Sequence, residues 1–421
     1  MQNDTIAAIA TPQGVGGVGV IRVSGGESFQ LVAPLLRRPG KESIPSIPPT
    51  HHLTYRVITD PQTQEVLDEV LVAFMRAPHT YTCEDVVEIQ GHGGPLILRR
   101  ILRAVLRQGA RLANPGEFTL RSFLNGRLDL AQAEAVMDLI GSQTEAGQRL
   151  AMQQLRGKLS EQVQQARTSM LGAIARIEAS IDFPEDDVPT PLAEELQPFI
   201  IEARQQVDKL LAGSDQGRLY RQGVRTAIIG RPNVGKSSLL NALLRMERAI
   251  VTPIAGTTRD TVEEIANLRG VPLHLIDTAG MTPTEDPVER IGVERSRAAA
   301  ENADIILHVF DGSVPLAEHD WQVLEELRGM GYGKQGARPV IAVLNKSDCE
   351  QVITPATLAE LWPGAPVVAT STLVETGLEE LENTLAELVQ AGSVMSNESV
   401  LITSARHQEA LRRGEGILRP R

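Results

Sequence analysis

The stretch that most constrains this chain is Gly230-Arg-Pro-Asn-Val-Gly-Lys-Ser237. It follows the apolar run 226–229 and precedes the leucine-rich segment 238–244, so the sequence predicts a strand, a glycine-bounded loop and a helix. Backbone N–H groups of such a loop point at a phosphate, and the helix N-terminus favours negative charge. Lys236 would reach the β- and γ-phosphates, and the Ser237 hydroxyl would bind Mg²⁺. An ordinary glycine-rich turn is the alternative, but strand, spacing, lysine and serine all agree on a nucleotide-phosphate site.

The composition is that of a multidomain intracellular protein. The 421 residues suffice for roughly three domains, and a hydrophobic content of 42% allows a sizeable core. The net charge of −12 and the aromatic content of 3% argue against a global basic surface or a base-stacking platform. Cys83 and Cys349 lack metal-finger spacing and suit a reducing compartment. Because no secretion signal or membrane-length apolar run is present, we expect a soluble cytoplasmic protein without membrane contact.

Four segments of the chain differ in character. Residues 1–118 predict a small α+β domain, in which His92-Gly-Gly-Pro95 opens a helix. From 119 to 218 the apolar spacing predicts long amphipathic helices packed as a bundle, followed by a linker at Gly213–Gly217. Residues 219–388 alternate strands and helices, which is typical of an α/β sheet that binds ligands at the carboxyl ends of its strands. Residues 389–421 return to polar, helix-like sequence.

Two charged segments leave alternatives open. Arg99, Arg103 and Arg107 recur at helical spacing on a different face from an apolar stripe. This pattern favours a solvated face, with a contact to RNA or to a partner protein as the alternative. The acidic segment 182–187 has flanking prolines and no histidine, so a solvated loop is favoured over a metal site.

Asn345-Lys-Ser-Asp348 follows the apolar segment 340–344 and indicates which base is bound. The Asp348 carboxylate can accept hydrogen bonds from N1–H and the amino group of guanine, which adenine cannot supply. A buried polar site left unpaired by the wrong base discriminates strongly. At the end of a strand downstream of the phosphate loop, this string predicts GTP over ATP. Ser371-Thr-Leu373 follows the next strand and is the expected second base-contacting loop, although it departs from the usual Ser-Ala-Lys.

The residues expected around the γ-phosphate lie between these motifs. Asp277-Thr-Ala-Gly280 ends a predicted strand, where the aspartate suits an indirect hold on Mg²⁺ and the glycine can offer an N–H to the phosphate. Thr258, within segment 254–260, is the expected further Mg²⁺ ligand. Many GTPases place a glutamine directly after this glycine to orient water, but here the residue is Met281. Glu289 could orient a water, although from the residues alone a surface position on a helix is the simpler interpretation.

Taken together, the motifs closely resemble those of the MnmE (TrmE) family of tRNA-modification GTPases over nearly the whole chain. The strings that carry the resemblance are Asp4-Thr-Ile6, Gly16-Gly-Val-Gly19, Tyr81-Thr82, Glu84-Asp85, His92-Gly-Gly94, Pro115-Gly-Glu-Phe118, Asn125-Gly-Arg-Leu-Asp-Leu-Ala-Gln-Ala-Glu-Ala135, Ile181-Asp-Phe-Pro184, Gly230-Arg-Pro-Asn233, Ala255-Gly-Thr-Thr-Arg-Asp260 and Val288-Glu-Arg-Ile-Gly292. The N-terminal and helical strings are the more specific ones, since many GTPases share the others.

The resemblance implies an architecture and a set of partners. Residues 1–118 would be a tetrahydrofolate-binding domain that also forms a homodimer. Residues 119–218 and 389–421 would form one helical domain, with the GTPase domain of residues 219–388 inserted into it. The GTPase domains would meet across the dimer when GTP and K⁺ are bound, which activates hydrolysis. With the FAD-dependent MnmG (GidA) protein, the complex would install an aminomethyl-type group at C5 of the wobble uridine in certain tRNAs.

The resemblance also implies roles for individual residues. Arg22, Glu88 and Arg127 would bind a 5-formyl- or methylene-tetrahydrofolate. Glu289 falls on the water-orienting glutamate and would act in catalysis with Lys236 and Thr258. The residues expected to contact K⁺ are Asn233, Thr252, Ile254 and Thr257. The expected nucleotide contacts are Asn233, Val234, Gly235, Lys236, Ser237, Ser238, Thr252, Pro253, Ile254, Ala255, Gly256, Thr257, Thr258, Asp277, Thr278, Ala279, Gly280, Asn345, Lys346, Asp348, Ser371, Thr372 and Leu373.

The sequence also departs from the family at its end. Members normally continue further and finish in a Cys-x-Gly-Lys type tail, whereas this sequence stops at Arg421, and neither Cys83 nor Cys349 is placed to replace that cysteine. We expect a truncated chain, a reading frame lost near Gly414, or a form without the modification step, with GTP binding and hydrolysis retained. Two other functions stay open, namely a GTP-dependent switch that assists ribosome assembly and a purely structural subunit.

Overall fold

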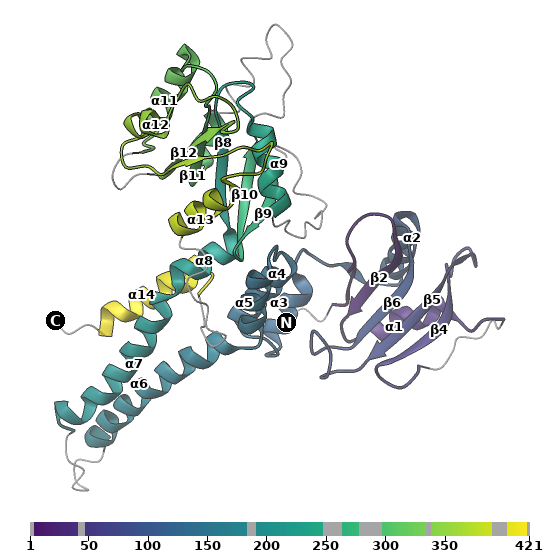
Figure 1. The fold of residues 1–421 in the computed structure, drawn as a ribbon. Helices are drawn as coiled ribbons and strands as arrows, with labels where there is room; N and C mark the ends of the chain where they lie inside the picture. The colour runs from purple at the N-terminus through teal and green to yellow at the C-terminus, as the bar shows by residue number, and fades with distance from the viewer. Residues whose placement is uncertain are drawn as a thin grey trace. The chain divides into compact units, whose positions relative to one another are not determined.

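The computed structural model describes residues 4–40, 47–182, 191–246, 263–277, 297–333, 338–389 and 402–418. They form two compact units, unit 1 ending at Met137 and unit 2 beginning at Asp138 (Figure 1). The predicted combination of an α+β part, a helical part and an α/β part is confirmed. Within the described ranges, no helix is both long enough and apolar enough to cross a membrane.

Unit 1 is built on a seven-stranded sheet in the order β3-β4-β5-β6-β2-β1-β7. Neighbouring strands pair antiparallel, except that β1 and β7 run parallel. The strands are β1 (Ile6–Ile9), β2 (Gly16–Ser24), β3 (Leu36–Arg37), β4 (His52–Thr59), β5 (Val66–Met75), β6 (Val86–Gly93) and β7 (Arg111–Leu112). The helical segments are α1 (Ser28–Val32), the 3₁₀ turn η1 (Ala33–Leu35), α2 (Pro95–Arg107), α3 (Glu117–Leu124) and α4 (Leu130–Ile140), whose end belongs to unit 2.

Helices α1 and α2 bury one face of this sheet and form the core of unit 1. The approach of α2 is so close that a Cβ on Gly19 would lie 2.4 Å from the Leu98 side chain, which explains the glycine in β2. Only Pro95 of the predicted helix-opening string starts the helix, because His92 and Gly93 complete β6. Proline suits the first helical position, where its missing N–H would have no partner in any case.

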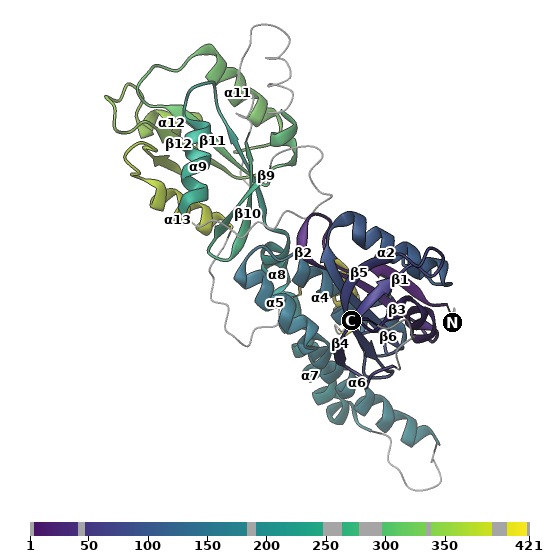
Figure 2. The same cartoon turned by 90° about the vertical axis from the view of Figure 1, so that its right-hand side faces the viewer.

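The helical part of unit 2 contains α5 (Glu145–Leu155), α6 (Lys158–Asp182), α7 (Ala193–Ala212), α8 (Ser214–Gln222) and α14 (Ala405–Leu418). Helices α6 and α7 lie side by side (Figures 1 and 2), and α14 packs against α7 (Figure 1). The prediction of a linker at Gly213–Gly217 is wrong, because Gly213 caps the end of α7 and residues 214–217 form the start of α8. Tyr220 of this helix is buried against Ala146 and Leu150, and such packing outweighs the weak helix propensity of glycine.

The second sheet has six strands in the order β13-β12-β11-β8-β10-β9, all parallel except the edge strand β9. The strands are β8 (Val224–Ile229), β9 (Glu263–Leu268), β10 (Val271–Asp277), β11 (Ile305–Asp311), β12 (Val340–Asn345) and β13 (Val367–Ala369). Around it lie α9 (Lys236–Met246), α11 (Glu318–Gly329), α12 (Pro355–Leu361) and α13 (Leu378–Leu388). Apolar cores cover both faces, so the parallel strands read as continuous hydrophobic runs. Their carboxyl ends bring the predicted motifs to one edge.

Candidate functional site

The loop between β8 and α9 takes its shape from the guanine motif as well as from its own residues. Asn233 and Gly235 have φ angles of 64° and 97°, in the left-handed region. A Cβ on Gly235 would lie 2.2 Å from Nδ2 of Asn345, so only glycine fits there. Asn345 is buried at the end of β12 and donates from Nδ2 to the Val234 carbonyl at 2.8 Å. The two motifs therefore form one hydrogen-bonded structure.

Lys236, the first residue of α9, places its charge over this loop. Its Nζ donates to the carbonyl oxygens of Gly230 and Arg231, both at 2.8 Å. The ammonium group and the N-terminus of α9 thus lie together, and both favour a bound anion. Ser237 and Ser238 follow in the first turn and are exposed. This arrangement is suited to the phosphates of a nucleotide.

The base-recognition side is formed by the loops after β12 and β13. The hydroxyl of Ser371 donates a hydrogen bond to Oδ1 of Asp348, and this bond lowers the pKa of the Asp348 carboxyl. The carboxylate therefore stays ionised at neutral pH and can accept from the N1–H and amino groups of guanine. Ser371 is buried, Thr372 is half-buried and Leu373 is exposed. The structure thus brings the two predicted base-contacting loops together.

Sequence reasoning missed the residue that holds Lys346 in this loop. Asp311, the last residue of β11, accepts a hydrogen bond from Nζ of Lys346 at 2.6 Å. Burial raises the pKa of the Asp311 carboxyl, but hydrogen bonds from Lys346 and Ser313 outweigh it and lower the pKa overall. The sequence contained a signal for this contact, since Asp311 directly follows a buried strand whose end lies at the same edge of the sheet.

The predicted switch residues lie outside the described part of the chain. These residues are Thr252, Pro253, Ile254, Ala255, Gly256, Thr257, Thr258, Thr278, Ala279, Gly280, Met281 and Glu289. The same holds for segment 183–187, which contains most of the acidic stretch. Asp277 is described only as the end of β10. The roles of these residues stay predictions.

In unit 1, two of the three residues predicted to bind folate, Arg22 and Arg127, lie beside the ring of Tyr81, and the third, Glu88, pairs with Arg22. Arg22 of β2 and Glu88 of β6 face each other in the ladder, and Arg22 Nε donates to Glu88 Oε1 at 2.8 Å. The guanidinium groups of Arg22 and Arg127 lie 5.3 Å and 5.1 Å from the centroid of Tyr81. Phe118 is a second ring beside Arg22, at 5.6 Å. The cluster combines a carboxylate acceptor, two cations and two stacking surfaces.

A second charged cluster of unit 1, missed from the sequence, holds α3 against the sheet. Glu117 accepts from Arg111 at 2.6 Å and from the backbone N–H of Asn114 at 2.7 Å. Arg121 is buried and donates hydrogen bonds to both Asp4 and Glu117, so the same cluster includes the two carboxylates. The hydrogen bond from Arg111, supported by those from Asn114 and Arg121, lowers the pKa of Glu117 to about 2 against the opposing effect of burial. The cluster is structural.

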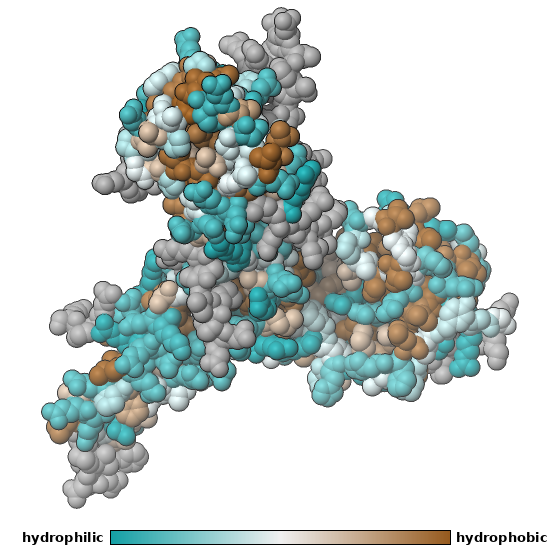
Figure 3. All heavy atoms as spheres, in the orientation of Figure 1, coloured by the Kyte–Doolittle hydropathy of each residue, from teal (hydrophilic) through white to brown (hydrophobic). Residues whose placement is uncertain are grey.

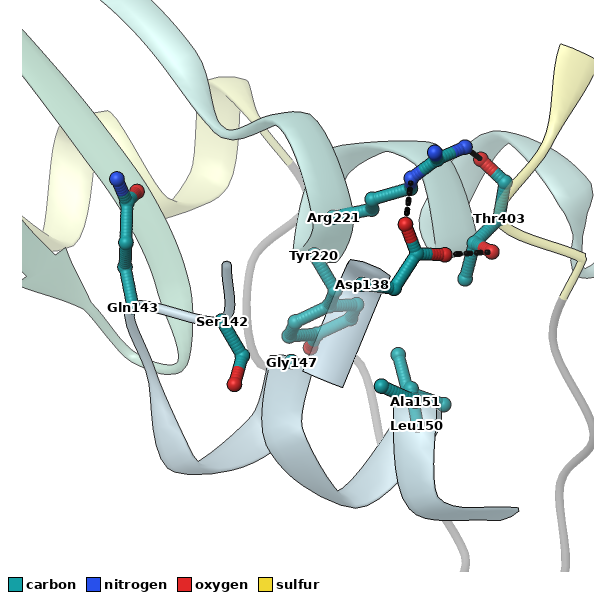
Figure 4. A pocket seen from close by; sticks show the side chains of 9 residues that line it. All are labelled: Asp138, Ser142, Gln143, Gly147, Leu150, Ala151, Tyr220, Arg221 and Thr403. Atoms are coloured by element: carbon teal, nitrogen blue, oxygen red, sulfur yellow. Dashed lines mark hydrogen bonds and ion pairs between the residues drawn. The ribbon is translucent and has the colours of Figure 1, made fainter. Parts of the chain in front are cut away.

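Unit 2 contains a small cavity where α4, α5 and α8 meet the start of the last segment (Figure 4). Arg221 Nε pairs with Asp138 at 2.8 Å, and Arg221 Nη1 donates to the Thr403 carbonyl at 3.3 Å. The cavity measures about 20 Å³, which is room for roughly one water and not for a substrate. Its lining is Asp138, Ser142, Gln143, Gly147, Leu150, Ala151, Tyr220, Arg221 and Thr403. We interpret this cavity as a packing contact between helices and not as a binding site.

The phosphate loop, the asparagine that braces it and the ionised Asp348 together define a guanine-nucleotide-binding protein of the P-loop class. Comparison with known proteins narrows this class. The family model of the GTP-binding protein TrmE N-terminus matches residues 5–127, and that of the MnmE helical domain matches residues 130–419. The chain belongs to the MnmE (TrmE) family of tRNA modification GTPases. The predicted family and the predicted GTPase activity are thereby confirmed.

Individual relatives cover nearly the whole chain. The tRNA modification GTPase MnmE of Alkaliphilus oremlandii is 45% identical over 98% of this chain and 87% of its own length. The protein of the same name from Geobacillus thermodenitrificans is 47% identical over 96% of this chain and 86% of its own length. Among solved structures, the G domain of the T. maritima FeoB iron transporter is 30% identical, with a TM-score of 0.30 over 39% of this chain and 97% of that domain.

Proposed function

We propose that this chain is the K⁺-dependent GTPase subunit of a complex that modifies C5 of the wobble uridine in tRNA, with a reduced folate bound to unit 1. The complex is cytoplasmic, and its other component is the FAD-dependent MnmG (GidA) protein. The observation that carries the proposal is the Arg22–Glu88 pair beside Tyr81, in a chain that also contains a GTP site. A GTP switch for ribosome assembly needs no such cluster.

The donor set around Tyr81 fits a reduced folate, which supplies a one-carbon unit. The pyrimidine edge of a pterin carries neighbouring N–H donors, and Glu88 is a carboxylate that accepts them. Tyr81 and Phe118 are flat apolar surfaces on which the ring system can pack. The guanidinium group of Arg127 lies 5.1 Å from the centroid of Tyr81, and such a group can pair with the carboxylates of a folate tail.

The described residues also fit the ions expected at the GTP site. The Ser237 hydroxyl lies in the first turn of α9 and would bind Mg²⁺ together with Thr258. Asn233 is exposed within the phosphate loop, and its amide oxygen is a suitable ligand for K⁺. Thr252, Ile254 and Thr257 would complete that site. A cation at this position would supply positive charge beside the phosphates, while Lys236 would hold them and Glu289 would orient the attacking water.

An exposed apolar patch of unit 1 supports the proposed homodimer. Leu53, Tyr55 and Leu71 have exposed fractions of 55%, 46% and 42%. Tyr55 and Leu71 lie directly opposite each other in the β4–β5 ladder. Figure 3 shows apolar residues gathered on the visible face of unit 1. Patches of this kind mark interaction surfaces, and we assign this one to the second copy of the chain.

Three measurements test the proposal. Hydrolysis of GTP should be faster in KCl than in NaCl at equal ionic strength, and Asn233→Ala should abolish the difference; equal rates in both salts would contradict K⁺ dependence.

Glu88→Gln should weaken binding of 5-formyl-tetrahydrofolate by roughly tenfold or more, since a charge-assisted acceptor is lost. Glu65→Gln is the matched control, because Glu65 also pairs with an arginine of unit 1. Restoration of wobble-uridine modification in cells that lack the gene tests the complete function.

A further inference from the structure

We propose that the outer face of α2 is a docking surface for the phosphodiester backbone of RNA. This surface, the arginine stripe, consists of Arg99, Arg100, Arg103 and Arg107. The inference rests on the proposed function in one respect, namely that the RNA is the tRNA to be modified. It concerns a part of unit 1 that neither the GTP site nor the Arg22–Glu88 cluster uses.

The helical geometry places these four side chains on one face. At 3.6 residues per turn they fall within an arc of roughly 100°, and Leu98, Ile101 and Val105 are buried in the core on the other side. Arg99, Arg103 and Arg107 follow one another at intervals of four residues, so their Cβ atoms are about 5–6 Å apart. With a rise of about 1.5 Å per residue, the row extends over roughly 12 Å.

Helix α2 is positively charged, whereas the whole chain is negatively charged. The 13 residues of α2 include these four arginines and no acidic residue, whereas the chain carries a net charge of −12. Such a segment concentrates positive potential on a surface that is otherwise negative or mixed. An ordinary solvated helix face more often alternates charges of both signs, which stabilise each other along the helix.

Two of the four arginines have acidic partners. Arg100 pairs with Glu65, and both side chains are close to half exposed. Arg107 pairs with Asp60 at 3.2 Å. Asp60 and Glu65 lie at the two ends of the turn between β4 and β5. An ion pair as exposed as Arg100–Glu65 contributes about 0–1 kcal/mol, so a phosphate could replace Glu65 at little cost. The side chain of Asp60 is only 14% exposed, so Arg107 is the less available of the two arginines.

The other two arginines have no carboxylate partner within the residues that the structure describes. Arg99 donates from Nε to the Pro95 carbonyl at 3.1 Å, a bond that leaves its two terminal nitrogens for a ligand. Arg103 forms no ion pair with any described residue. A guanidinium group presents paired donors that match two phosphate oxygens, which makes unpaired arginines good phosphate ligands.

The chemistry of the arginine stripe favours RNA over an acidic protein. Repeating cations without interleaved aromatic side chains suit evenly spaced phosphates and carry no information about base sequence. Leu96 is 66% exposed and lies at the N-terminal end of the same face, three residues before Arg99. One apolar side chain at the end of the stripe is not the apolar centre that a protein interface requires. Binding should therefore be strongly dependent on salt and tolerant of RNA sequence.

The test compares two double variants of the full chain, R99Q/R103Q and R297Q/R413Q. The control pair removes the same total charge from exposed helical arginines of unit 2, which pair with Glu301 and Glu409. Affinity for an unmodified tRNA transcript is measured by fluorescence anisotropy over a range of KCl concentrations. Each lost phosphate contact should reduce the slope of log K against log [salt] by about 0.7 and weaken binding about fivefold at roughly 0.1 M salt.

We therefore expect R99Q/R103Q to bind tRNA about 25-fold more weakly than the native chain, with the slope reduced by about 1.4, and the control to remain within about twofold. Equal losses in both variants, no loss in R99Q/R103Q, or no tRNA binding by the native chain would each overturn the proposal. The proposal would also be overturned if R99Q/R103Q kept its affinity for tRNA but no longer bound the FAD-dependent partner, because the arginine stripe would then be a protein-binding surface. K⁺-dependent GTP hydrolysis by R99Q/R103Q should be unchanged, so failure of the proposed function shows separately.

Discussion

Glutamine in place of Glu117 should destabilise unit 1 selectively. The shift in the pKa of Glu117 from 4.5 to about 2 corresponds to about 3.4 kcal/mol at neutral pH, because one pKa unit is worth about 1.4 kcal/mol. Arg111, the main partner, is 38% exposed, and solvent screening reduces this value. We therefore expect E117Q to lower the free energy of unfolding of unit 1 by about 2–3 kcal/mol.

The pH dependence of this effect has a defined sign. The pKa of Glu117 is lower in the folded state than in the unfolded state, so its stabilisation is complete above about pH 4.5 and is lost as the pH falls towards 2. At pH 3 the difference between the native chain and E117Q should have shrunk to roughly 40% of its neutral value.

Hydrogen exchange followed by mass spectrometry measures the effect in peptides from β1 and α3. Protection at neutral pH should fall by a factor of roughly 30 to 150. Trp321 and Trp362, the two tryptophans of the chain, both lie in unit 2, so their fluorescence during urea unfolding is an internal control and should not change. Unchanged protection in E117Q, or a difference that persists at pH 3, would refute the reasoning.

Three further predictions concern unit 2. Lys236→Ala should weaken GTP binding at least 100-fold, as measured by isothermal titration, since its ammonium lies over the phosphate loop; unchanged affinity would exclude this role. Asp348→Asn should relax the preference for guanine in competition assays with other nucleotides, and a preserved preference would remove Asp348 from base recognition. Desolvation lowers the pKa of buried His308 to about 3, so the folded state keeps this side chain neutral. The free energy of unfolding is therefore unaffected by this group above about pH 6.5 and decreases as the pH falls below that value. Unfolding monitored by Trp362, whose indole donates to His308, should show a loss of about 2 kcal/mol at pH 5, and His308→Phe should remove that pH dependence.

The parts of the fold that the sequence predicts well are those with strong periodicity. The parallel strands β8, β11 and β12 of the second sheet are buried on both faces, so continuous apolar runs mark them in the sequence. Two-residue strands such as β3 and β7 carry no periodic signal, because only their pairing with distant strands defines them. Helix α8 was missed because glycine and aspartate suggest a loop, whereas the buried Tyr220 decides the outcome.

The candidate site shows the same division. Motif spacing places Lys236 and Asp348 at one edge of the sheet, since strand order and direction follow from the α/β pattern. It cannot show that Asn345 braces the phosphate loop through the Val234 carbonyl, because this contact joins residues that are far apart in sequence. Nor can it give the register that sets Arg22 opposite Glu88, which depends on the pairing of β2 with β6.

The hydrogen bond from Arg221 to the Thr403 carbonyl indicates that the segment between α8 and Ile402 could be replaced by another sequence. It means that the polypeptide leaves the helical part after α8 and comes back within the reach of a single side chain. The second sheet is thus part of a segment whose two ends lie next to each other in space. An inserted segment with adjacent ends disturbs the surrounding domain least. A short glycine–serine bridge from Gly223 to Ile402 should leave α5 to α8 and α14 able to pack together. Another domain with neighbouring termini could be spliced in at the same position.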